Sequence, residues 1–240
     1  RTERRPGIPP DPTINMNPLD KVGRPKQSKD NEVDESSLFY TPDETRYILS
    51  CLNNEPLKWR AYVMLLIDTG CRRGEITGIR WTAIDFESST ILVDRNLQYT
   101  PSKGTYVSTP KGRKKRIVDI SPEVVSILKE FKKVQDPPSE WVFTQSRKAI
   151  PMHPDSPNQF FKRFGKKYGI EDFHPHKLRH TSASLAITNG ADVVSVAARL
   201  GHSDSSTTLR MYAHANQDNI RRAGQAVRKA LENKKDSTVD

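Results

Sequence analysis

The segment His174-Pro-His-Lys-Leu-Arg-His-Thr181 decides how the rest of the chain is interpreted. His176 and Arg179 stand three residues apart, so they share one face if the segment is helical. The apolar residues that follow, ending at Asn189-Gly190, predict a helix with a C-terminal glycine stop. A guanidinium beside an imidazole is well suited to gripping a phosphate group. We therefore expect phosphate chemistry in the C-terminal third of the chain.

The composition favours a polyanionic partner. The 240 residues include 39 Lys and Arg against 29 Asp and Glu, which gives a formal net charge of +10 and an isoelectric point near 9.6. Such a balance favours nucleic acid or an anionic membrane surface. The sequence holds no apolar run long enough to cross a bilayer. Its length suits one large domain, or a domain with a tail.

The two cysteines and the two ends of the chain carry further expectations. Cys51 and Cys71 lack the spacing of metal ligands, so we expect reduced thiols. No secretion signal is visible, and the start at Arg1 is expected for a fragment. Residues 1–37 are polar and rich in proline, which predicts an interdomain linker. Arg24 and Lys26 in this linker are expected to follow a nucleic-acid backbone; the alternative is a plain disordered tether.

The pattern beyond residue 37 predicts an α+β fold that is mainly helical. Thr41-Pro42-Asp43-Glu44 combines an N-cap, a helical proline and a capping-box glutamate. Apolar periodicity then predicts helices with buried faces and, over residues 90–120, strands with a period of two. We expect one small antiparallel sheet of about three strands. The expected segments are a first helix with the buried stripe Tyr47, Ile48, Leu49 and Leu52; a central helix through Trp59 and Ile67; strands Thr90–Val93, Leu97–Tyr99, Tyr106–Val107 and Arg116–Ile120; and helices from Pro122, over Pro157–Tyr168, over Val193–Leu200, around Tyr212 and after Asn219.

An ordered set of short motifs carries a resemblance to a known family. The motifs are Arg72 and Glu75 in Thr-Gly-Cys-Arg-Arg-Gly-Glu, Lys111 in Thr-Pro-Lys-Gly, His176-x-x-Arg179, His202 in Leu-Gly-His-Ser, and Tyr212. Their order and spacing resemble the catalytic set of the tyrosine recombinases, the phage integrase family. The resemblance covers residues 39–233. Each motif alone is weak, whereas the ordered set is specific.

This resemblance implies the tyrosine-recombinase catalytic fold and a strand-transfer reaction on DNA. A tyrosine hydroxyl attacks a phosphodiester and leaves a 3′-phosphotyrosine and a free 5′-hydroxyl, a role that falls on Tyr212. The resemblance further implies that no ATP, metal or other cofactor is needed. The resemblance also implies roles for the other residues. Arg72 and Arg179 would clamp the phosphate, and Glu75 would hold Arg72 in place. Lys111 would donate a proton to the 5′ oxygen, His176 would accept the tyrosine proton, and His202 would donate to a phosphate oxygen.

Each of these residues also has a simpler interpretation. An isolated Arg72 is better explained by solvation or phosphate positioning, and an isolated Tyr212 by half-buried packing. The run from Lys111 to Arg116 fits a solvated basic turn. Their co-occurrence favours the catalytic interpretation. Four other histidines are expected to be structural: His153, His174, His180 and His214.

Further basic residues are expected to bind DNA. Charged residues of the Pro157–Tyr168 helix face outward in the expected pattern and would contact the backbone, which sets register and salt dependence. The expected backbone contacts are Lys162, Arg163, Lys166 and Lys167, with Lys103, Arg113 and Lys114 on turns. Candidates for base readout are Gln98, Lys103 and Arg147.

We expect a catalytic domain over residues 38–218 and a C-terminal helix and tail over residues 219–240. The resemblance implies that Ile220, Val227 and Leu231 dock on a neighbouring protomer; the alternative is packing within one chain. It also implies double-stranded DNA with specific core sites, a dimer to tetramer on that DNA, accessory DNA-bending proteins, and a cytoplasmic, DNA-associated bacterial protein. The favoured function is integration and excision of a phage or conjugative transposon. The alternatives are a non-catalytic DNA-binding module and a chromosome-dimer resolvase of the same chemistry.

Overall fold

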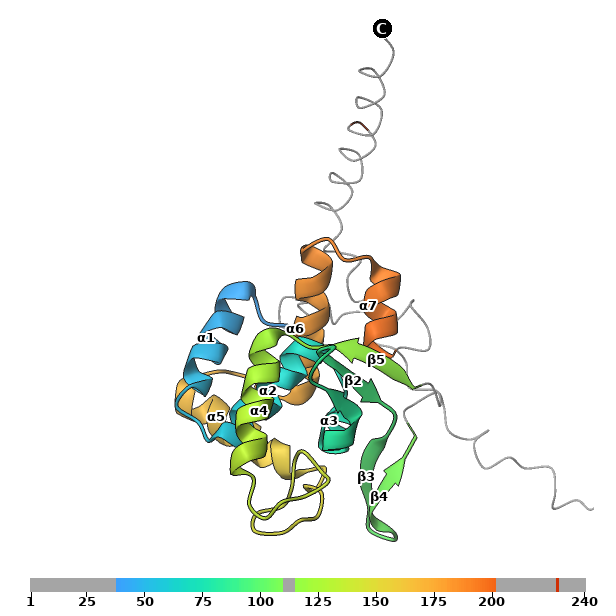
Figure 1. Ribbon diagram of the computed structural model, residues 1–240. Helices are drawn as coiled ribbons and strands as arrows, with labels where there is room; N and C mark the ends of the chain where they lie inside the picture. The colour runs from blue at the N-terminus through green and yellow to red at the C-terminus, as the bar shows by residue number, and fades with distance from the viewer. Residues whose placement is uncertain (1–37, 110–114, 202–227, 229–240) are drawn as a thin grey trace, which may run out of the picture. The chain divides into compact units, whose positions relative to one another are not determined.

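The computed structural model describes residues 38–109, 115–201 and 228. These residues belong to the larger of the two units into which the chain divides, residues 34–240. The elements in chain order are α1 (Pro42–Leu52), α2 (Leu57–Thr69), α3 (Arg73–Thr77), the 3-10 turn η2 (Trp81–Ala83), β1 (Ile84–Asp85), β2 (Thr90–Val93), β3 (Asn96–Thr100), β4 (Gly104–Ser108), β5 (Arg116–Asp119), α4 (Pro122–Val134), α5 (Ser156–Tyr168), α6 (Pro175–Thr188) and α7 (Val193–Leu200) (Figure 1).

The expected start of the first helix is confirmed, and one residue of its buried stripe is corrected. The Thr41 hydroxyl accepts from the Glu44 backbone N–H, and the Glu44 carboxylate accepts from the Thr41 N–H at 2.7 Å. Ile48 and Leu52 are buried, but Tyr47 is 52% exposed. The Tyr47 hydroxyl donates to the Tyr168 carbonyl at 3.1 Å, so this ring lies along the end of α5.

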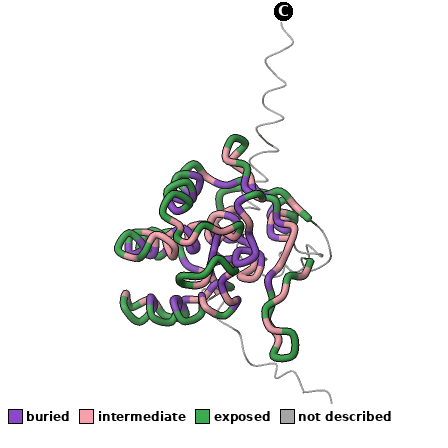
Figure 2. Tube along the Cα trace, turned by 60° about the horizontal axis from the view of Figure 1, so that its bottom comes forward, coloured by how far each residue is buried: buried purple, intermediate pink, exposed green. Residues whose placement is uncertain are grey.

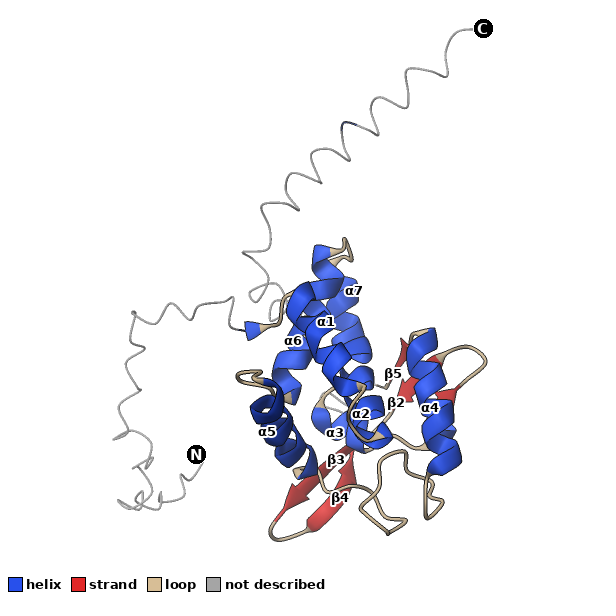
Figure 3. Cartoon of the chain, turned by 90° about the vertical axis from the view of Figure 1, so that its left-hand side faces the viewer, coloured by secondary structure: helices blue, strands red, loops and turns tan. Residues whose placement is uncertain are grey.

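Helix α2 is the centre of the described fold, as its nearly continuous apolar sequence predicts. It packs against α1, α3, α4 and α6, and α6 and α4 flank it in Figure 3. The helix ends at Gly70, whose φ of 61° is a left-handed conformation that glycine adopts without strain. The Cys71-Arg72 segment follows directly, so the end of α2 sets where α3 begins.

The strands form two separate antiparallel groups. The three-stranded sheet has the order β1-β2-β5, with Ile91 opposite Val118. This confirms the expected small antiparallel sheet, although its edge strand β1 was not among the expected strands. Strands β3 and β4 pair only with each other among the described residues, around a turn at 101–103. The ribbon that they form extends away from the sheet in Figure 1.

The main hydrophobic core lies between α2, α4 and α5, and a smaller one joins α6 to α7. The inward-facing apolar residues of α4 and α5 are buried (Figure 2). Phe161 and Phe164 are each 1% exposed. Burying one such aromatic side chain contributes about 1.5–3 kcal/mol. The smaller cluster consists of Ala183, Ile187, Val196 and Leu200. Because α7 also contacts β5, its last turn is fixed on two sides.

Candidate active site

The motif residues of α3 and α6 meet at one cavity of about 260 Å³. Arg72 is the N-cap residue of α3, and His176 and Arg179 lie in the first turns of α6. The residues that line the cavity are Cys71, Arg72, Arg73, Asn158, His174, Pro175, His176 and Arg179. Segments separated by about a hundred residues in sequence therefore supply one cationic pocket.

Arg179 is buried and held by backbone carbonyls. Its side chain donates from Nη1 to the Gly70 carbonyl at 2.6 Å and from Nη2 to the Leu200 carbonyl at 2.9 Å, and the residue is 3% exposed. Burial, together with the positive charge of Arg72, lowers the pKa of Arg179 to about 10. The guanidinium therefore stays charged at neutral pH. A guanidinium fixed in this way can present its remaining N–H groups to an anion in a set direction.

Arg72 is held by a buried carboxylate. It donates from Nη1 to Glu75 Oε1 at 3.1 Å, and its backbone N–H donates to Glu75 Oε2 at 2.9 Å. Glu75 is 1% exposed and also accepts two hydrogen bonds from Arg116. Burial alone would raise the pKa of Glu75, but the hydrogen bonds from Arg116 and Arg72 hold it below its usual range. Glu75 is therefore an anion that supports Arg72, as expected from their spacing.

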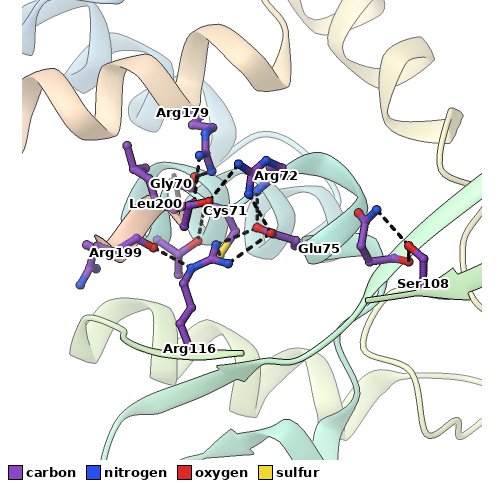
Figure 4. Close-up of polar contacts among 12 residues, drawn as sticks. Gly70, Cys71, Arg72, Glu75, Ser108, Arg116, Arg179, Arg199 and Leu200 are labelled. Carbon is purple, nitrogen blue, oxygen red and sulfur yellow. Dashed lines mark hydrogen bonds and ion pairs between the residues drawn. The ribbon is translucent and has the colours of Figure 1, made fainter. Parts of the chain in front are cut away.

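The C-terminal end of α7 also contacts these arginines (Figure 4). Arg72 Nη2 donates to the Gly201 carbonyl at 3.1 Å, next to the Leu200 carbonyl that accepts from Arg179. Helix carbonyls at this end lack partners within the helix and carry partial negative charge. The guanidinium groups satisfy them and are oriented in return.

His176 lines the cavity and stays neutral near pH 7. Partial burial lowers its pKa below the usual 6.5, and the positive charges of Arg179, His174 and Arg72 lower it further. Its ring packs edge-on against His180, with centroids 4.2 Å apart. A neutral imidazole at this position can accept a proton.

Two of the histidines expected to be structural cap local backbone. His174 is the N-cap of α6, where Nδ1 accepts from the Lys177 N–H at 3.1 Å. His153 Nδ1 accepts from the Asp155 N–H, and its ring lies 4.5 Å from that of Tyr99. His174 nevertheless also lines the cavity.

Several predicted site residues lie outside the described residues. They are Lys111, His202 and Tyr212, the turn residues Arg113 and Lys114, the linker residues Arg24 and Lys26, and the docking residues Ile220, Val227 and Leu231. Of the predicted catalytic set, the structure thus brings together Arg72, His176 and Arg179, with Glu75 behind Arg72. Cys51 and Cys71 are both free, as expected, and both are buried.

Sequence reasoning did not name Arg116 as a site residue: it placed Arg116 at the start of a strand, with a solvated basic turn as the simpler interpretation of the run from Lys111. The Arg116 side chain is 11% exposed and pairs with Glu75 at 2.7 Å. The alternation of β5 could have revealed its inward position. Arg116 lies on the same face of the strand as buried Val118, whereas Ile117 between them is 69% exposed. An arginine on the inward side of a strand needs a buried acceptor.

The predicted basic face of α5 is exposed but divided. Lys162 and Lys166 line a second cavity that shares Asn158 and His174 with the first. Lys167 instead pairs with Glu55 at 2.7 Å. Arg163 is exposed and lies over the Phe160 ring.

The other predicted DNA contacts lie on turns and on the β3–β4 ribbon. Lys103 is exposed at the turn, with its Nζ 5.6 Å from the Tyr106 ring centroid. Gln98 accepts from the Tyr106 hydroxyl at 2.9 Å. Arg147 is exposed on a loop with φ of 57°.

Among the described residues, no group of three or more His, Cys, Asp or Glu side chains is placed to hold a metal ion. No helix within the same residues has the length and apolar character needed to cross a membrane.

Solved structures of two recombinases share this fold. The Tn1549 transposon integrase, in complex with transposon right end DNA, superposes with a TM-score of 0.69 at 25% identity, over 78% of this chain and 65% of that chain. XerA recombinase superposes with a TM-score of 0.62 at 26% identity, over 79% of this chain and 65% of that chain.

Sequence comparisons agree with the structural ones. A tyrosine recombinase of Thermosipho africanus is 29% identical over 203 residues, which are 84% of this chain and 64% of that protein. The ICEBs1 integrase of Bacillus subtilis is 25% identical over 211 residues, which are 84% of this chain and 55% of that protein. The chain thus spans somewhat less than two thirds of these relatives. Residues 39–219, more than half of the 240, match the phage integrase family, and the chain belongs to that family.

Proposed function

We propose that the chain is the catalytic domain of a site-specific DNA recombinase that cuts and rejoins DNA through a 3′-phosphotyrosine. The observation that carries this proposal is the convergence of Arg72, Arg179 and His176 on one cavity, with both guanidiniums anchored by backbone carbonyls. The buried carboxylate of Glu75 lies behind Arg72 and is held by Arg116 as well. The pocket is therefore left with excess positive charge, which suits a phosphodiester.

The proposed reaction exchanges one phosphate ester for another. The Tyr212 oxygen forms a bond to phosphorus while the bond to the 5′ oxygen breaks, and the 5′ oxygen leaves as a hydroxyl. A phenol has an ordinary pKa of about 10, so it leaves more readily than an alcohol when the DNA hydroxyl attacks in return. The bond energy is kept in the covalent link, and rejoining the strand consumes no ATP.

The described residues supply the electrostatics of this step. Negative charge gathers on the non-bridging oxygens in the transition state, where Arg72 and Arg179 offer preoriented donors. Neutral His176 accepts the tyrosine proton. Lys111 donates a proton to the departing 5′ oxygen, and His202 donates to a phosphate oxygen. These last two assignments rest on the order of the family motifs.

Double-stranded DNA with specific core sites is the proposed partner. The DNA complex of the Tn1549 integrase supports this choice. The likeness to that protein and to the ICEBs1 integrase supports a mobile element as the source. We further propose residues 1–37 as a linker, residues 38–218 as the catalytic domain, and residues 219–240 as a helix that docks on a second protomer of a dimer to tetramer.

The nucleophile is tested by trapping the covalent intermediate. The purified protein is incubated with a library of nicked duplexes randomised at the centre, so that cleavage releases a short fragment and traps the adduct. We expect a denaturation-resistant protein–DNA adduct that Tyr212→Phe abolishes. Tyr47→Phe is the matched control, because the Tyr47 hydroxyl donates to the Tyr168 carbonyl and does not line the cavity, and it should leave the adduct unchanged. An adduct that survives Tyr212→Phe would remove Tyr212 from this role.

A second candidate within the same chemistry is a chromosome-dimer resolvase. The chain is as similar in sequence to XerA recombinase, at 26% identity, as to the Tn1549 integrase. Plasmids carrying paired sites recovered from the adduct library separate the two. An integrase is expected to join two different sites with help from a DNA-bending protein, whereas a resolvase recombines two copies of one site.

A further inference from the structure

Arg116 directs its side chain into the protein. Nε donates to the Arg199 carbonyl at 2.8 Å, Nη1 to Glu75 Oε1 at 3.2 Å, and Nη2 to Glu75 Oε2 at 2.7 Å. Nη2 also donates to Cys71 Sγ at 3.4 Å. Arg116 does not line the candidate active site. Four of its five N–H groups therefore donate to protein acceptors.

Three arginines hold three consecutive carbonyls at the end of α7. Arg116 binds the Arg199 carbonyl, Arg179 the Leu200 carbonyl and Arg72 the Gly201 carbonyl. Only the first of these arginines lies outside the cavity. The Arg116 guanidinium also lies directly against Gly201, where an added Cβ would come within 2.8 Å of Nη1. The main chain at this point leads straight into His202.

Glu75 connects Arg116 to Arg72. One carboxylate oxygen accepts from both guanidiniums, at 3.1 Å from Arg72 and 3.2 Å from Arg116. Without Arg116, this buried carboxylate would keep only its contacts to Arg72, and its position would change with them. The orientation of Arg72 is thus tied to a residue of β5 on the opposite side of Glu75 (Figure 4).

We propose that Arg116 is a positioning residue of the strand-transfer site. It fixes Arg72 through Glu75, and it fixes the carbonyl row of α7 that orients Arg72 and Arg179, without contacting DNA itself. This inference rests on the proposed function, since it assumes that the two arginines clamp the scissile phosphate. It assigns the first residue of β5 to the geometry of catalysis and not to backbone binding.

The test uses Arg116→Lys, which keeps the charge but loses the forked geometry. We expect adduct formation at saturating DNA to slow by about 100-fold, because a displacement near 1 Å costs that much. The KM for DNA should stay within about twofold, since surface phosphate contacts are unchanged. Arg95→Lys is the matched control. Arg95 donates two hydrogen bonds to Asp94, at 2.8 and 2.9 Å, and this substitution should leave the rate of adduct formation and the KM unchanged.

A second variant separates positioning from folding. Arg116→Met combined with Glu75→Gln removes both buried charges and leaves no carboxylate unpaired. Because part of the effect of Arg116 passes through Glu75, the double variant should slow adduct formation by less than the product of the two single effects, a non-additive result. All rates are measured well below the Tm of each variant, so that a loss of stability alone does not change them.

A modified substrate separates the arginine clamp from the proton donor. When sulfur replaces the 5′-bridging oxygen, a thiolate leaves without needing a proton, because its ordinary pKa is about 8.5. We expect this substrate to rescue Lys111→Ala but not Arg116→Lys. Rescue of Arg116→Lys, a raised KM with unchanged maximal rate, or an unaltered rate would each overturn the inference. If the unsubstituted protein forms no adduct, the proposed function itself fails, and the inference fails with it.

Discussion

Two cationic regions of this molecule differ in how their charges are held. The arginine cluster, Arg72, Arg116 and Arg179, lies against Glu75 and the end of α7, with hydrogen bonds to carbonyl and carboxylate oxygens. The basic face of α5, Lys162, Arg163, Lys166 and Lys167, is exposed. Both regions were predicted from sequence, apart from Arg116.

We propose that this difference separates catalysis from affinity. A guanidinium that is already fixed needs little reorganisation when charge develops on a phosphate. Its effect therefore appears in the rate of the chemical step. An exposed lysine is hydrated and mobile before DNA arrives, so its effect appears in binding and in salt dependence. On this proposal, the same formal charge has two functions, which depend on the acceptors that hold it. Substitutions in each region test this division.

The largest expected effect is that of Arg72→Ala. Removing one preorganised donor slows the chemical step by about 100- to 1000-fold. The 29% exposure of the Arg72 side chain makes this variant easier to fold than a change at Arg179. Single-turnover cleavage and DNA affinity are measured separately. If the variant binds DNA weakly but cleaves at the normal rate, Arg72 acts in DNA binding, as the exposed α5 residues are expected to do. That result would contradict the division between the two regions.

The next effect is a pH dependence set by His176. Its pKa is lowered by partial burial and by Arg179, His174 and Arg72, so the proton-accepting form persists below pH 6.5. The cleavage rate should therefore be level at neutral pH and fall only as the pH drops through this lowered value. His176→Gln should slow cleavage by about 100-fold and remove the acid limb. An acid limb centred above pH 6.5 would contradict the assignment.

Local signals explain why so much of the fold could be predicted. The Thr41 cap, the alternation in β2 and β5, and the aromatic stripe of α5 depend on neighbours in sequence. Even the bounds of α7, Val193–Leu200, match the expected segment. The spacing of Arg72 and Glu75 within one helical turn also predicts their contact.

Contacts between distant segments could not be predicted in this way. Arg116 meets Glu75 across 41 positions and the Arg199 carbonyl across 83. Its acceptor on α7 is a backbone carbonyl oxygen, which every residue carries, so the residue type at that position does not reveal the contact. The expected burial of Tyr47 was wrong for a related reason, since the ring is placed by the end of α5 and not by its own helix.

The smallest expected effect is on the α5 face, and it sharpens the comparison most directly. Lys162→Ala and Lys166→Ala should each weaken DNA binding by about fivefold and reduce the salt slope by about one unit, with single-turnover cleavage unchanged at saturation. Lys167→Ala offers an internal contrast, because Lys167 already pairs with Glu55 at 2.7 Å. Its release toward DNA would require breaking that contact, so its slope change should be smaller. Equal changes at all three positions, measured by binding titrations at several salt concentrations, would mean that the whole face meets DNA uniformly and that the Glu55 pair is given up on binding.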